Sequence, residues 1–234
     1  MFDKIKKDLN ALKNKEKAEN MSRFFKTGKG EYGEGDIFLG LTSQEIKDVI
    51  KKYFKEIDFS DLQKLFDSKI HEYRVAGLRI LVEKYKKADE KEKKNIFNFY
   101  LKNTKNINNW DLVDLSAPNI IGNYLLNKNR KILYKLVKSK KLWEKRISVL
   151  ATYEFIRNNQ FDDTLKISEI LLNDEHDLIH KAVGWMLREI GKKNQAIEEK
   201  FLKKYYKTMP RTMLRYAIEK FNKNKREFYL KNDK

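Results

Sequence analysis

The sequence predicts an all-α protein, an α-solenoid of stacked helical hairpins, and three observations support this fold class. Apolar residues recur at helical spacing almost throughout, as in residues 156–172 and 178–190. The alternation of apolar and polar residues that marks strands is almost absent, and the 234 residues include only two prolines, Pro118 and Pro210. Similar segments also recur at about 35 residues, the length of a two-helix unit.

The elements follow one another through short polar turns. A glycine-rich connection is expected at residues 27–36, and the capping-box pair Thr42 and Glu45 then predicts the start of a helix. Further turns are predicted at 127–131, 138–141, 173–177 and 191–195. Five segments between these turns are predicted to form the inner helices of the solenoid. They are residues 71–81, 108–117, 142–152, 178–188 and 212–221.

Alignment of these five segments places one residue of each in a common register. These residues are Arg74, Trp110, Arg146, Lys181 and Arg215, with steps of 36, 36, 35 and 34 residues between them. Three of the five are arginines, from only ten in the chain, which makes chance spacing among many basic residues a weaker explanation. We therefore expect a single solenoid domain at residues 1–230, with about six helical pairs, and a tail at 231–234.

The charge of the chain favours a polyanionic partner. Lys and Arg number 52 against 34 Asp and Glu, a formal charge of +18, and cations that neutralise phosphates release condensed counterions. A lysine-rich surface that serves solubility alone is the alternative. There is no cysteine, no visible signal peptide and no apolar run of the roughly 18 residues needed to span a bilayer. A soluble, cytoplasmic and nucleoid-associated protein is expected.

Residues four positions beyond each register point share the same side of their helices. We call these residues the second line, and they are Leu78, Asp114, Leu150, Trp185 and Glu219. A concave basic groove is thus predicted to combine register cations, two indoles and one acid. Its members are Arg146, Lys181, Arg215, Trp110, Trp185 and Asp114. Leu78 and Leu150 indicate that part of this second line belongs to the core.

The two acids of residues 108–114, NNWDLVD, have different explanations. If Asn108 caps the helix, Asp111 occupies its third position, where a carboxylate favours free amides and the helix dipole. Asp114 lies one turn deeper and needs no capping role, and neighbouring cations would keep it ionised. Because a lone carboxylate repels phosphates, its presence in such a groove requires a purpose, and stabilising a sugar cation is one.

Cleavage of an N-glycosidic bond develops positive charge on C1′ of the deoxyribose. A fixed anion lowers that barrier and orients or deprotonates the attacking water. Ordinary glycosidases need a second carboxyl group to protonate the leaving group, whereas a purine alkylated at N3 or N7 is already cationic and departs without it. Trp110 and Trp185 could pack on the sugar and stabilise the cation, although on sequence alone both fit a hydrophobic core equally well.

Five segments resemble the AlkD-like DNA alkylation repair family, DNA glycosylases built from HEAT-like helical repeats. They cover most of the chain in the family order, at residues 22–41, 108–118, 142–152, 180–192 and 209–221. The motifs WDLVD at 110–114 and GWMLRE at 184–189 are the most specific. The resemblance implies a monofunctional glycosylase that hydrolyses the N-glycosidic bond of N3- and N7-alkylated purines, such as 3-methyladenine and 7-methylguanine, in duplex DNA during base excision repair.

The resemblance also assigns roles residue by residue. Asp114 matches the catalytic aspartate of the family's WDxxD motif, and Trp110 and Trp185 match the tryptophans of its active-site cleft. Arg146 matches the arginine of the WxxR stretch, and Arg188 falls in the WxLRE segment. The DNA-binding residues expected are Arg74, Arg146, Lys181, Arg188 and Arg215. A monomer that acts on double-stranded DNA is expected, without a membrane, a cofactor or a metal.

Two weaker signals complete the sequence. The connection at 27–36 is longer and richer in glycine than in compact bacterial members, and could shape the groove mouth or offer free amides to the DNA backbone. His176 and His180 have the spacing of metal ligands on a helix, but no third ligand is evident, so solvated helix residues are the preferred interpretation.

Two alternatives to a glycosylase remain open at this point. Some relatives have lost the catalytic acid, so a catalytically inactive HEAT-repeat protein that binds bent or damaged DNA is one of them. A scaffold whose groove holds an acidic protein segment is the other. Salt-dependent binding to duplex DNA separates DNA binders from the scaffold, and release of 7-methylguanine separates the enzyme from the silent binder.

Overall fold

A computed structural model describes residues 1–231 and confirms the predicted all-α class. Over this range the chain forms no β-strand, and the only extended pairing is an isolated parallel bridge between Ile37 and Ile70. The predicted tail at 231–234, apart from Lys231 at the end of the last helix, lies outside the described residues.

The chain divides into two compact units, Met1–Ser116 and Ala117–Lys234. The helices of the first unit, with α7 ending at the boundary, are α1 (Phe2–Ala11), α2 (Lys15–Phe24), α3 (Ser43–Ile50), α4 (Phe59–Phe66), α5 (His71–Lys87), α6 (Glu90–Lys102), η1 (Thr104–Asn106) and α7 (Trp110–Ala117). The single domain predicted over residues 1–230 and the concave basic groove stay predictions.

The second unit is helical from its first residues. Its elements are the π-helix η2 (Pro118–Gly122), α8 (Asn123–Leu125), α9 (Lys131–Val137), α10 (Leu142–Arg157), α11 (Asp162–Ile170), α12 (Asp177–Lys193), α13 (Gln195–Tyr205), α14 (Arg211–Ala217), η3 (Ile218–Lys220) and α15 (Lys223–Lys231). The polar turns predicted at 127–131, 138–141 and 173–177 separate these helices, whereas α12 continues through Lys193, so only the end of the turn predicted at 191–195 interrupts the helical structure.

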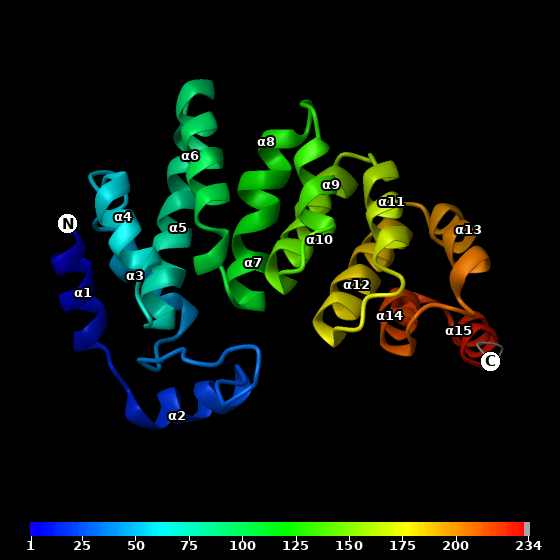
Figure 1. The fold of residues 1–234 in the computed structure, drawn as a ribbon, viewed down its shortest axis with the longest axis horizontal. Helices are drawn as coiled ribbons and strands as arrows, with labels where there is room; N and C mark the ends of the chain where they lie inside the picture. Colours follow the sequence, from blue (N-terminus) through cyan, green and yellow to red (C-terminus); the bar gives the residue numbers. More distant parts are fainter. Residues whose placement is uncertain (232–234) are drawn as a thin grey trace. The chain divides into compact units, whose positions relative to one another are not determined.

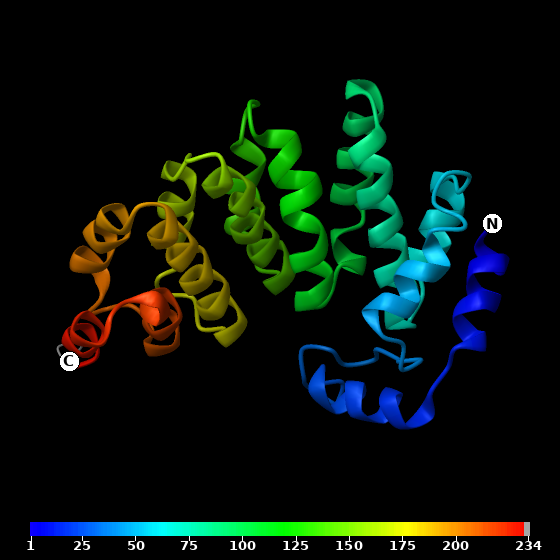
Figure 2. The ribbon, with the colours of Figure 1, turned by 180° about the vertical axis from the view of Figure 1, so that it is seen from behind.

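Helix α5 is the centre of the first unit. It packs against α3, α4 and α6, while α1 packs against α3 and α4. α5 is buried around most of its circumference, including Tyr73, Leu78 and Leu81. Helix α2 is set apart from α1, α3, α4 and α5 in both ribbon views (Figures 1 and 2), and the glycine-rich connection leads from it to α3.

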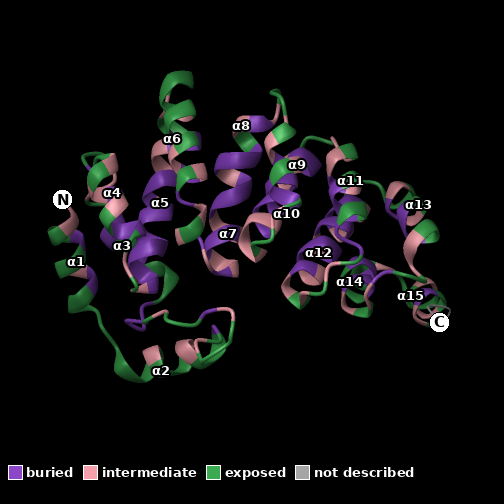
Figure 3. Cartoon of the chain, viewed as in Figure 1, coloured by how far each residue is buried: buried purple, intermediate pink, exposed green. Residues whose placement is uncertain are grey.

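In the second unit, α10 and α12 occupy the corresponding central positions. α10 packs against η2, α9, α11 and α12, and α12 packs against α13 and α14. Colouring by burial shows long buried stretches in α5, α10 and α12, whereas exposed residues dominate much of α6 (Figure 3). The side chains of Leu78 in α5 and Leu150 in α10 are completely buried, which confirms that part of the predicted second line belongs to the core.

Helix starts follow the capping rules that the sequence suggested. The Thr42 hydroxyl accepts the amide of Glu45, and the Glu45 carboxylate accepts the amide of Thr42 at 2.6 Å, so the predicted capping box is confirmed at the start of α3. Asp58 and Asp89 cap α4 and α6 in the same way, each accepting a backbone amide of the first turn. Within the part of the chain that is described, no helix is both long and apolar enough to traverse a bilayer.

Candidate functional site

Helix α7 carries two of the three residues predicted for catalysis, Trp110 and Asp114. The helix begins at Trp110, and the side-chain oxygen of Asn109 accepts the Trp110 amide at 2.8 Å. The predicted cap at Asn108 is therefore one residue too early and is wrong. Asp111 is the second residue of the helix, and its partners are not those expected for a carboxylate at the third position. One of its carboxylate oxygens accepts the Leu112 amide, and the other contacts the ring of a buried histidine, described below.

Trp110 is half-buried against two phenylalanines at the end of α2. The ring of Phe25 stacks on the indole, with 5.2 Å between the ring centroids and 15° between the planes. Phe24 meets the indole edge-on at 5.9 Å and 77°, yet it remains 65% exposed. An aromatic surface next to Trp110 is thus open to solvent. Sequence analysis did not single out Phe24, for which the only signal was its place within residues 22–41.

Asp114 lies one helical turn beyond Trp110 and is half-buried. Burial raises the pKa of the Tyr100 hydroxyl, and the carboxylate of Asp114 adds to that rise, so the two groups interact. Tyr100 also shares a hydrogen bond with the Ser116 hydroxyl at 2.9 Å. Since Pro118 has no amide hydrogen, the α-helical bond from residue 118 to the carbonyl of residue 114 cannot form, and the chain continues as a π-helix.

A buried ionic cluster adjoins the first turn of α7. His71, 1% exposed at the start of α5, places Nε2 2.8 Å from an Asp111 oxygen and Nδ1 3.3 Å from an Asp36 oxygen. That Asp36 oxygen forms a 2.6 Å ion pair with Arg74, and the other Asp36 oxygen accepts the Asn108 side-chain amide at 3.2 Å. The cluster therefore connects the end of the glycine-rich connection, α5 and α7.

The position of Arg74 corrects its predicted role in DNA binding. Its side chain is only 4% exposed, and beyond the pair with Asp36 it donates to the carbonyl of Ser68 at 2.7 Å. A guanidinium held in this way has no surface to offer to a phosphate. Arg74 instead stabilises the buried Asp36 carboxylate, whose desolvation would otherwise be costly.

The glycine-rich connection uses two of the amides that the sequence suggested for DNA. The amide of Gly28 donates to Glu31 and that of Gly30 donates to Glu34, each at 2.8 Å. The expectation of free amides is therefore wrong at these two positions. Gly30 and Gly35 have φ angles of 79° and 85°, in the left-handed region where residues with a side chain are strained.

In the second unit, α12 positions the third predicted catalytic residue, Trp185. Its indole N–H donates to the Glu189 carboxylate, one turn later on the same helix, at 3.1 Å. The indole also lies 6.0 Å from the ring of Tyr153 at a tilt of 44°, and the guanidinium of Arg157 covers that ring at 4.4 Å. Trp185 is half-buried. The cluster of Trp185, Tyr153 and Arg157 is therefore partly exposed at the surface of this unit.

Arg146, also predicted to bind DNA, is buried at 4% exposure and donates to the carbonyl of Leu178 at 2.6 Å. Its prediction as a direct phosphate ligand is therefore corrected in the same way as that of Arg74. Both arginines occupy the predicted register within the first five residues of their helices, and both donate to a backbone carbonyl. The register thus identifies equivalent positions, but these two guanidinium groups stabilise the interior.

The remaining predicted cations differ in how accessible they are. Lys181 is partly exposed and pairs with Asp177 at 2.6 Å on its own helix, and Arg215 on α14 is exposed. Arg188 is 16% exposed and is paired with Glu219 and, at 3.6 Å, with Glu189. Lys181 and Arg215 therefore remain candidates for phosphate contact, whereas Arg188 is engaged within its unit.

Comparison with known families decides the broader assignment. A family model described as "DNA alkylation repair enzyme" matches residues 5–221. The chain belongs to this DNA alkylation repair family. A solved structure described as a predicted DNA alkylation repair enzyme from Enterococcus faecalis has a TM-score of 0.72 and 19% identity, covering 90% of this chain and 97% of that one. At that identity the likeness shows the fold. A comparison with curated proteins gives no match.

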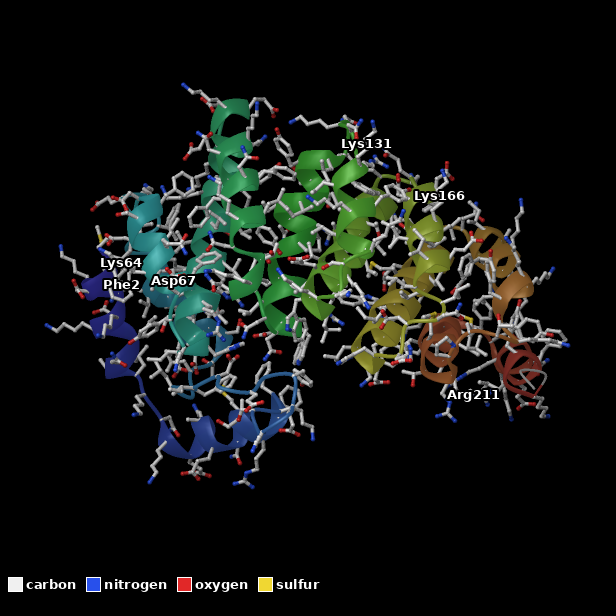
Figure 4. All side chains as sticks on the ribbon, viewed as in Figure 1. Phe2, Lys64, Asp67, Lys131, Lys166 and Arg211 are labelled. Atoms are coloured by element: carbon white, nitrogen blue, oxygen red, sulfur yellow. The ribbon has the colours of Figure 1, made fainter. Side chains whose placement is uncertain are left out.

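For a DNA alkylation repair protein, the second unit offers a basic surface that the register did not predict. An open depression is formed by α9, by the loop that leads into α9 and by α11. It is lined by four cations together with polar residues and one acid. Its lining residues are Lys128, Asn129, Arg130, Lys131, Tyr134, Asp163 and Lys166. Figure 4 labels Lys131 on α9 and Lys166 on α11. Arg130 is paired with Asp163 at 2.6 Å, which leaves the lysines as the candidates for contact with an anion.

The histidines have structural roles in this DNA alkylation repair protein. His176 caps α12 by accepting the amide of Leu178 at 3.1 Å, and His180 contacts the carbonyl of Asp174. Among the described residues there is no group of His, Asp or Glu side chains that could hold a metal ion. His71 is buried in an ionic cluster, and its spacing along the sequence gave no sign of this environment.

Proposed function

We propose that the chain is a DNA glycosylase that hydrolyses the N-glycosidic bond of purines alkylated at N3 or N7 in duplex DNA. The family assignment supports repair of alkylated DNA. The observation that carries the finer proposal is the placement of Asp114 one turn beyond the half-buried Trp110, with the exposed ring of Phe24 beside that indole. A carboxylate and two aromatic side chains suit a cationic sugar.

In the proposed reaction, the bond between C1′ and the purine nitrogen breaks first. Its electron pair passes to the alkylated base, which leaves as a neutral molecule, so no protein acid is required. The deoxyribose becomes an oxocarbenium ion, which the Asp114 carboxylate stabilises. Water then attacks C1′ and passes a proton to Asp114, which gives an abasic site. A single preorganised electrostatic group of this kind contributes about 10²- to 10³-fold in rate.

The proposed aromatic contacts of the sugar near Asp114 are those of the first unit, where Trp110 presents its indole next to Phe24. The catalytic role of Trp185 in the second unit stays a prediction. Because the Glu189 carboxylate accepts the Trp185 N–H, the indole face is the part of that side chain that remains for a cationic sugar. A π face attracts a nearby cation by about 0.5–2 kcal/mol, more when water is excluded.

Phosphate binding is assigned to the exposed cations and no longer to the buried ones. The candidates are Lys181 and Arg215, with Lys128, Lys131 and Lys166 of the depression on α9 and α11. Each phosphate neutralised releases condensed counterions, so the affinity for duplex DNA should fall as salt is added. Arg74, Arg146 and Arg188 would instead support the fold of the unit that carries each of them. We further propose that the protein acts as a monomer without a cofactor.

Replacement of Asp114 by Asn tests the proposal directly. The substitution preserves size and removes the negative charge, so we expect release of 7-methylguanine from methylated duplex DNA to fall by about 10²-fold or more. Affinity for the duplex should be equal or slightly higher, because one repulsive charge is lost. Liquid chromatography of the released bases and a fluorescence binding assay measure the two quantities.

Asp48→Asn is the matched control, since Asp48 on α3 is an exposed carboxylate paired with Lys51. This variant should release 7-methylguanine at the wild-type rate. Full activity of Asp114→Asn would contradict the mechanism. Absence of base release by the wild-type protein, together with tight duplex binding, would favour the catalytically silent DNA-binding protein instead.

A further inference from the structure

The ring of His71 is held between two carboxylates that come from different segments. Nε2 lies 2.8 Å from an oxygen of Asp111 on α7, and Nδ1 lies 3.3 Å from an oxygen of Asp36, at the end of the glycine-rich connection. An ionised carboxylate can only accept hydrogen bonds, and a neutral imidazole has a single N–H. Both contacts are hydrogen bonds at once only when the ring carries a proton on each nitrogen.

The charges around the ring favour the same protonation state. Arg74 balances the charge of Asp36, so this pair alone leaves the charge of Asp111 to be balanced. Arg74 also approaches Nδ1 at 3.5 Å and opposes a charge on the ring, but the contacts with the two carboxylates outweigh it. Arg79 also interacts with Asp111, but its guanidinium donates to the Ser43 hydroxyl at 2.7 Å. A cationic His71 places a compensating charge in direct contact with Asp111, whose half-buried carboxylate lies against the buried ring.

His71 is also coupled to Trp110 through ring contacts. Phe38 stacks on the imidazole at 4.6 Å and 25°, and Phe25 covers it at 5.1 Å and 38°. The same Phe25 ring stacks on the Trp110 indole at 5.2 Å. His71 therefore reaches Trp110 by two routes, through the Phe25 ring and through Asp111, the next residue along α7.

We propose that His71 is a positioning residue which, as an imidazolium held between Asp36 and Asp111, fixes the Trp110 indole and the first turn of α7 for the chemistry at Asp114. The proposal rests on the proposed function, because it assigns His71 to the geometry of that site. His71 touches neither the sugar nor the base. Its effect passes through Phe25 and Asp111, so it controls how often the site is in the reactive arrangement.

The acid–base behaviour of the cluster agrees with this role. Burial alone would lower the pKa of His71, but the hydrogen bonds to Asp111 and Asp36 outweigh it, and the pKa is raised above its ordinary value of 6.5. Since the folded pKa is raised, both hydrogen bonds from the His71 ring, to Asp36 and to Asp111, are present below pH 6.5. One of them is lost as the pH rises through the folded pKa. Deprotonation removes one of the two N–H donors and weakens the contact with Asp36 or with Asp111.

Nuclear magnetic resonance of the full chain tests the protonation state without reference to activity. With ¹⁵N-labelled histidine, we expect both ring nitrogens of His71 to show protonated shifts at pH 6.5, while His176 and His180 serve as internal references. Assignment uses His71→Gln, in which one set of signals disappears. A neutral His71 ring at pH 6.5, with one unprotonated nitrogen, would overturn the proposal.

The position of the indole is read separately with 5-fluorotryptophan. The three tryptophans give three ¹⁹F signals, and Trp110→Phe assigns one of them. His71→Gln and Asp111→Asn should each shift or broaden the Trp110 signal while leaving the Trp185 signal unchanged. An unmoved Trp110 signal in both variants would refute the coupling even if the protein turned out to have no glycosylase activity.

Single-turnover excision of 7-methylguanine provides the functional test. Misplacement of a catalytic group costs up to about 100-fold, so His71→Gln and Asp111→Asn should slow excision by about 10- to 100-fold and leave duplex affinity within about two-fold. His180→Gln is the matched control with an unchanged rate. If His71→Gln fails to fold, Asp111→Asn still decides the matter, because the Asp111 side chain is 25% exposed and Asn preserves its shape.

The pH profile separates positioning from a purely structural role. In the wild-type protein, the single-turnover rate should fall as the pH rises through the folded pKa of His71, and in His71→Gln this step should be missing. Identical profiles would mean that His71 only stabilises the fold. If the wild-type protein excises no base, the proposed function fails, and the ¹⁵N and ¹⁹F signals still report whether His71 positions Trp110.

Discussion

The two tryptophans predicted for catalysis are held in different ways. In the unit Met1–Ser116, Trp110 stacks on Phe25, which belongs to a segment remote in sequence and also covers the buried His71. In the unit Ala117–Lys234, Trp185 donates its indole N–H to Glu189 on its own helix and tilts against Tyr153. One indole is oriented by tertiary packing, and the other mainly by the helix that carries it.

This difference predicts how sensitive the surroundings of each tryptophan are to substitution. Partners four residues apart on a helix are already ordered by that helix, and each such pair contributes only a few tenths of a kcal/mol. The Trp110 surroundings instead join the glycine-rich connection, α5 and α7 through buried charges and stacked rings. Changes remote in sequence should therefore disturb Trp110 more than Trp185, and two matched pairs of substitutions test this contrast.

The largest effect is expected for Phe25→Ala. The Phe25 ring is 7% exposed and contacts Trp110, Phe38 and His71, and removal of a buried phenylalanine ring costs about 3–5 kcal/mol. Tyr153→Ala is the matched change beside Trp185, where a half-buried ring should cost only about 1 kcal/mol. Urea unfolding measures the free energy of unfolding of both variants. Equal losses would remove the distinction between the two indoles.

The next effect concerns the carboxylates. Asp36→Asn leaves Arg74 without its anion, which should cost about 3 kcal/mol, the low end for a broken buried pair because Asn can still accept hydrogen bonds. Glu189→Gln loses a pair with the exposed Lys192 and the longer contact with Arg188, and should cost about 1 kcal/mol or less. Urea unfolding at pH 7 compares the two, and a larger loss for Glu189→Gln would invert the contrast.

The pH dependence sharpens the prediction for Asp36. Although burial alone would raise its pKa, the hydrogen bond from His71 and the charge of Arg74 lower the pKa below the ordinary 3.8. A depressed folded pKa means that the stabilisation is present above pH 3.8 and is lost as the pH falls through the folded pKa. The stability difference between the wild type and Asp36→Asn should therefore persist at neutral pH and disappear in strong acid.

The smallest effect is expected for Glu198 of α13, which is 1% exposed. Burial, with a contribution from Glu199, raises the pKa of Glu198 to about 8. Because this folded pKa is raised, the contribution of Glu198 to stability should be lost as the pH rises from 4.5 to about 8. Thermal unfolding of Glu198→Gln should lack this loss, and Glu227→Gln, an exposed acid on α15, is the control.

Local features of the fold were predictable from the sequence because their partners are close in the chain. The capping box of Thr42 and Glu45 needs only a spacing of three residues, and the start of α3 is where the pattern places it. Helical periodicity predicted the inner helices and a register that falls within their first five residues, from α5 to α14. Each of these inferences uses interactions that a helix makes within itself.

The environments of the charged residues were not predictable in this way. Spacing shows that Arg74 and Arg146 are equivalent, but their partners are the carbonyls of Ser68 and Leu178, and any residue type provides a carbonyl. A cation that binds a phosphate and one that donates to a buried backbone carbonyl can thus have the same spacing in the sequence. His71 is similar, since its contacts with Asp36 and Asp111 come from tertiary packing.

The glycine-rich connection offers an attachment point for molecular tools. Its tip at Gly28–Glu31 is exposed, and the bond from the Gly33 amide to the Lys26 carbonyl closes the loop at its base. Lengthening a closed surface loop costs little, about 0.6 kcal/mol for each doubling. A short peptide tag or a fluorophore inserted between Lys29 and Gly30 should leave Asp36 in place, and would let binding to damaged DNA be followed in real time.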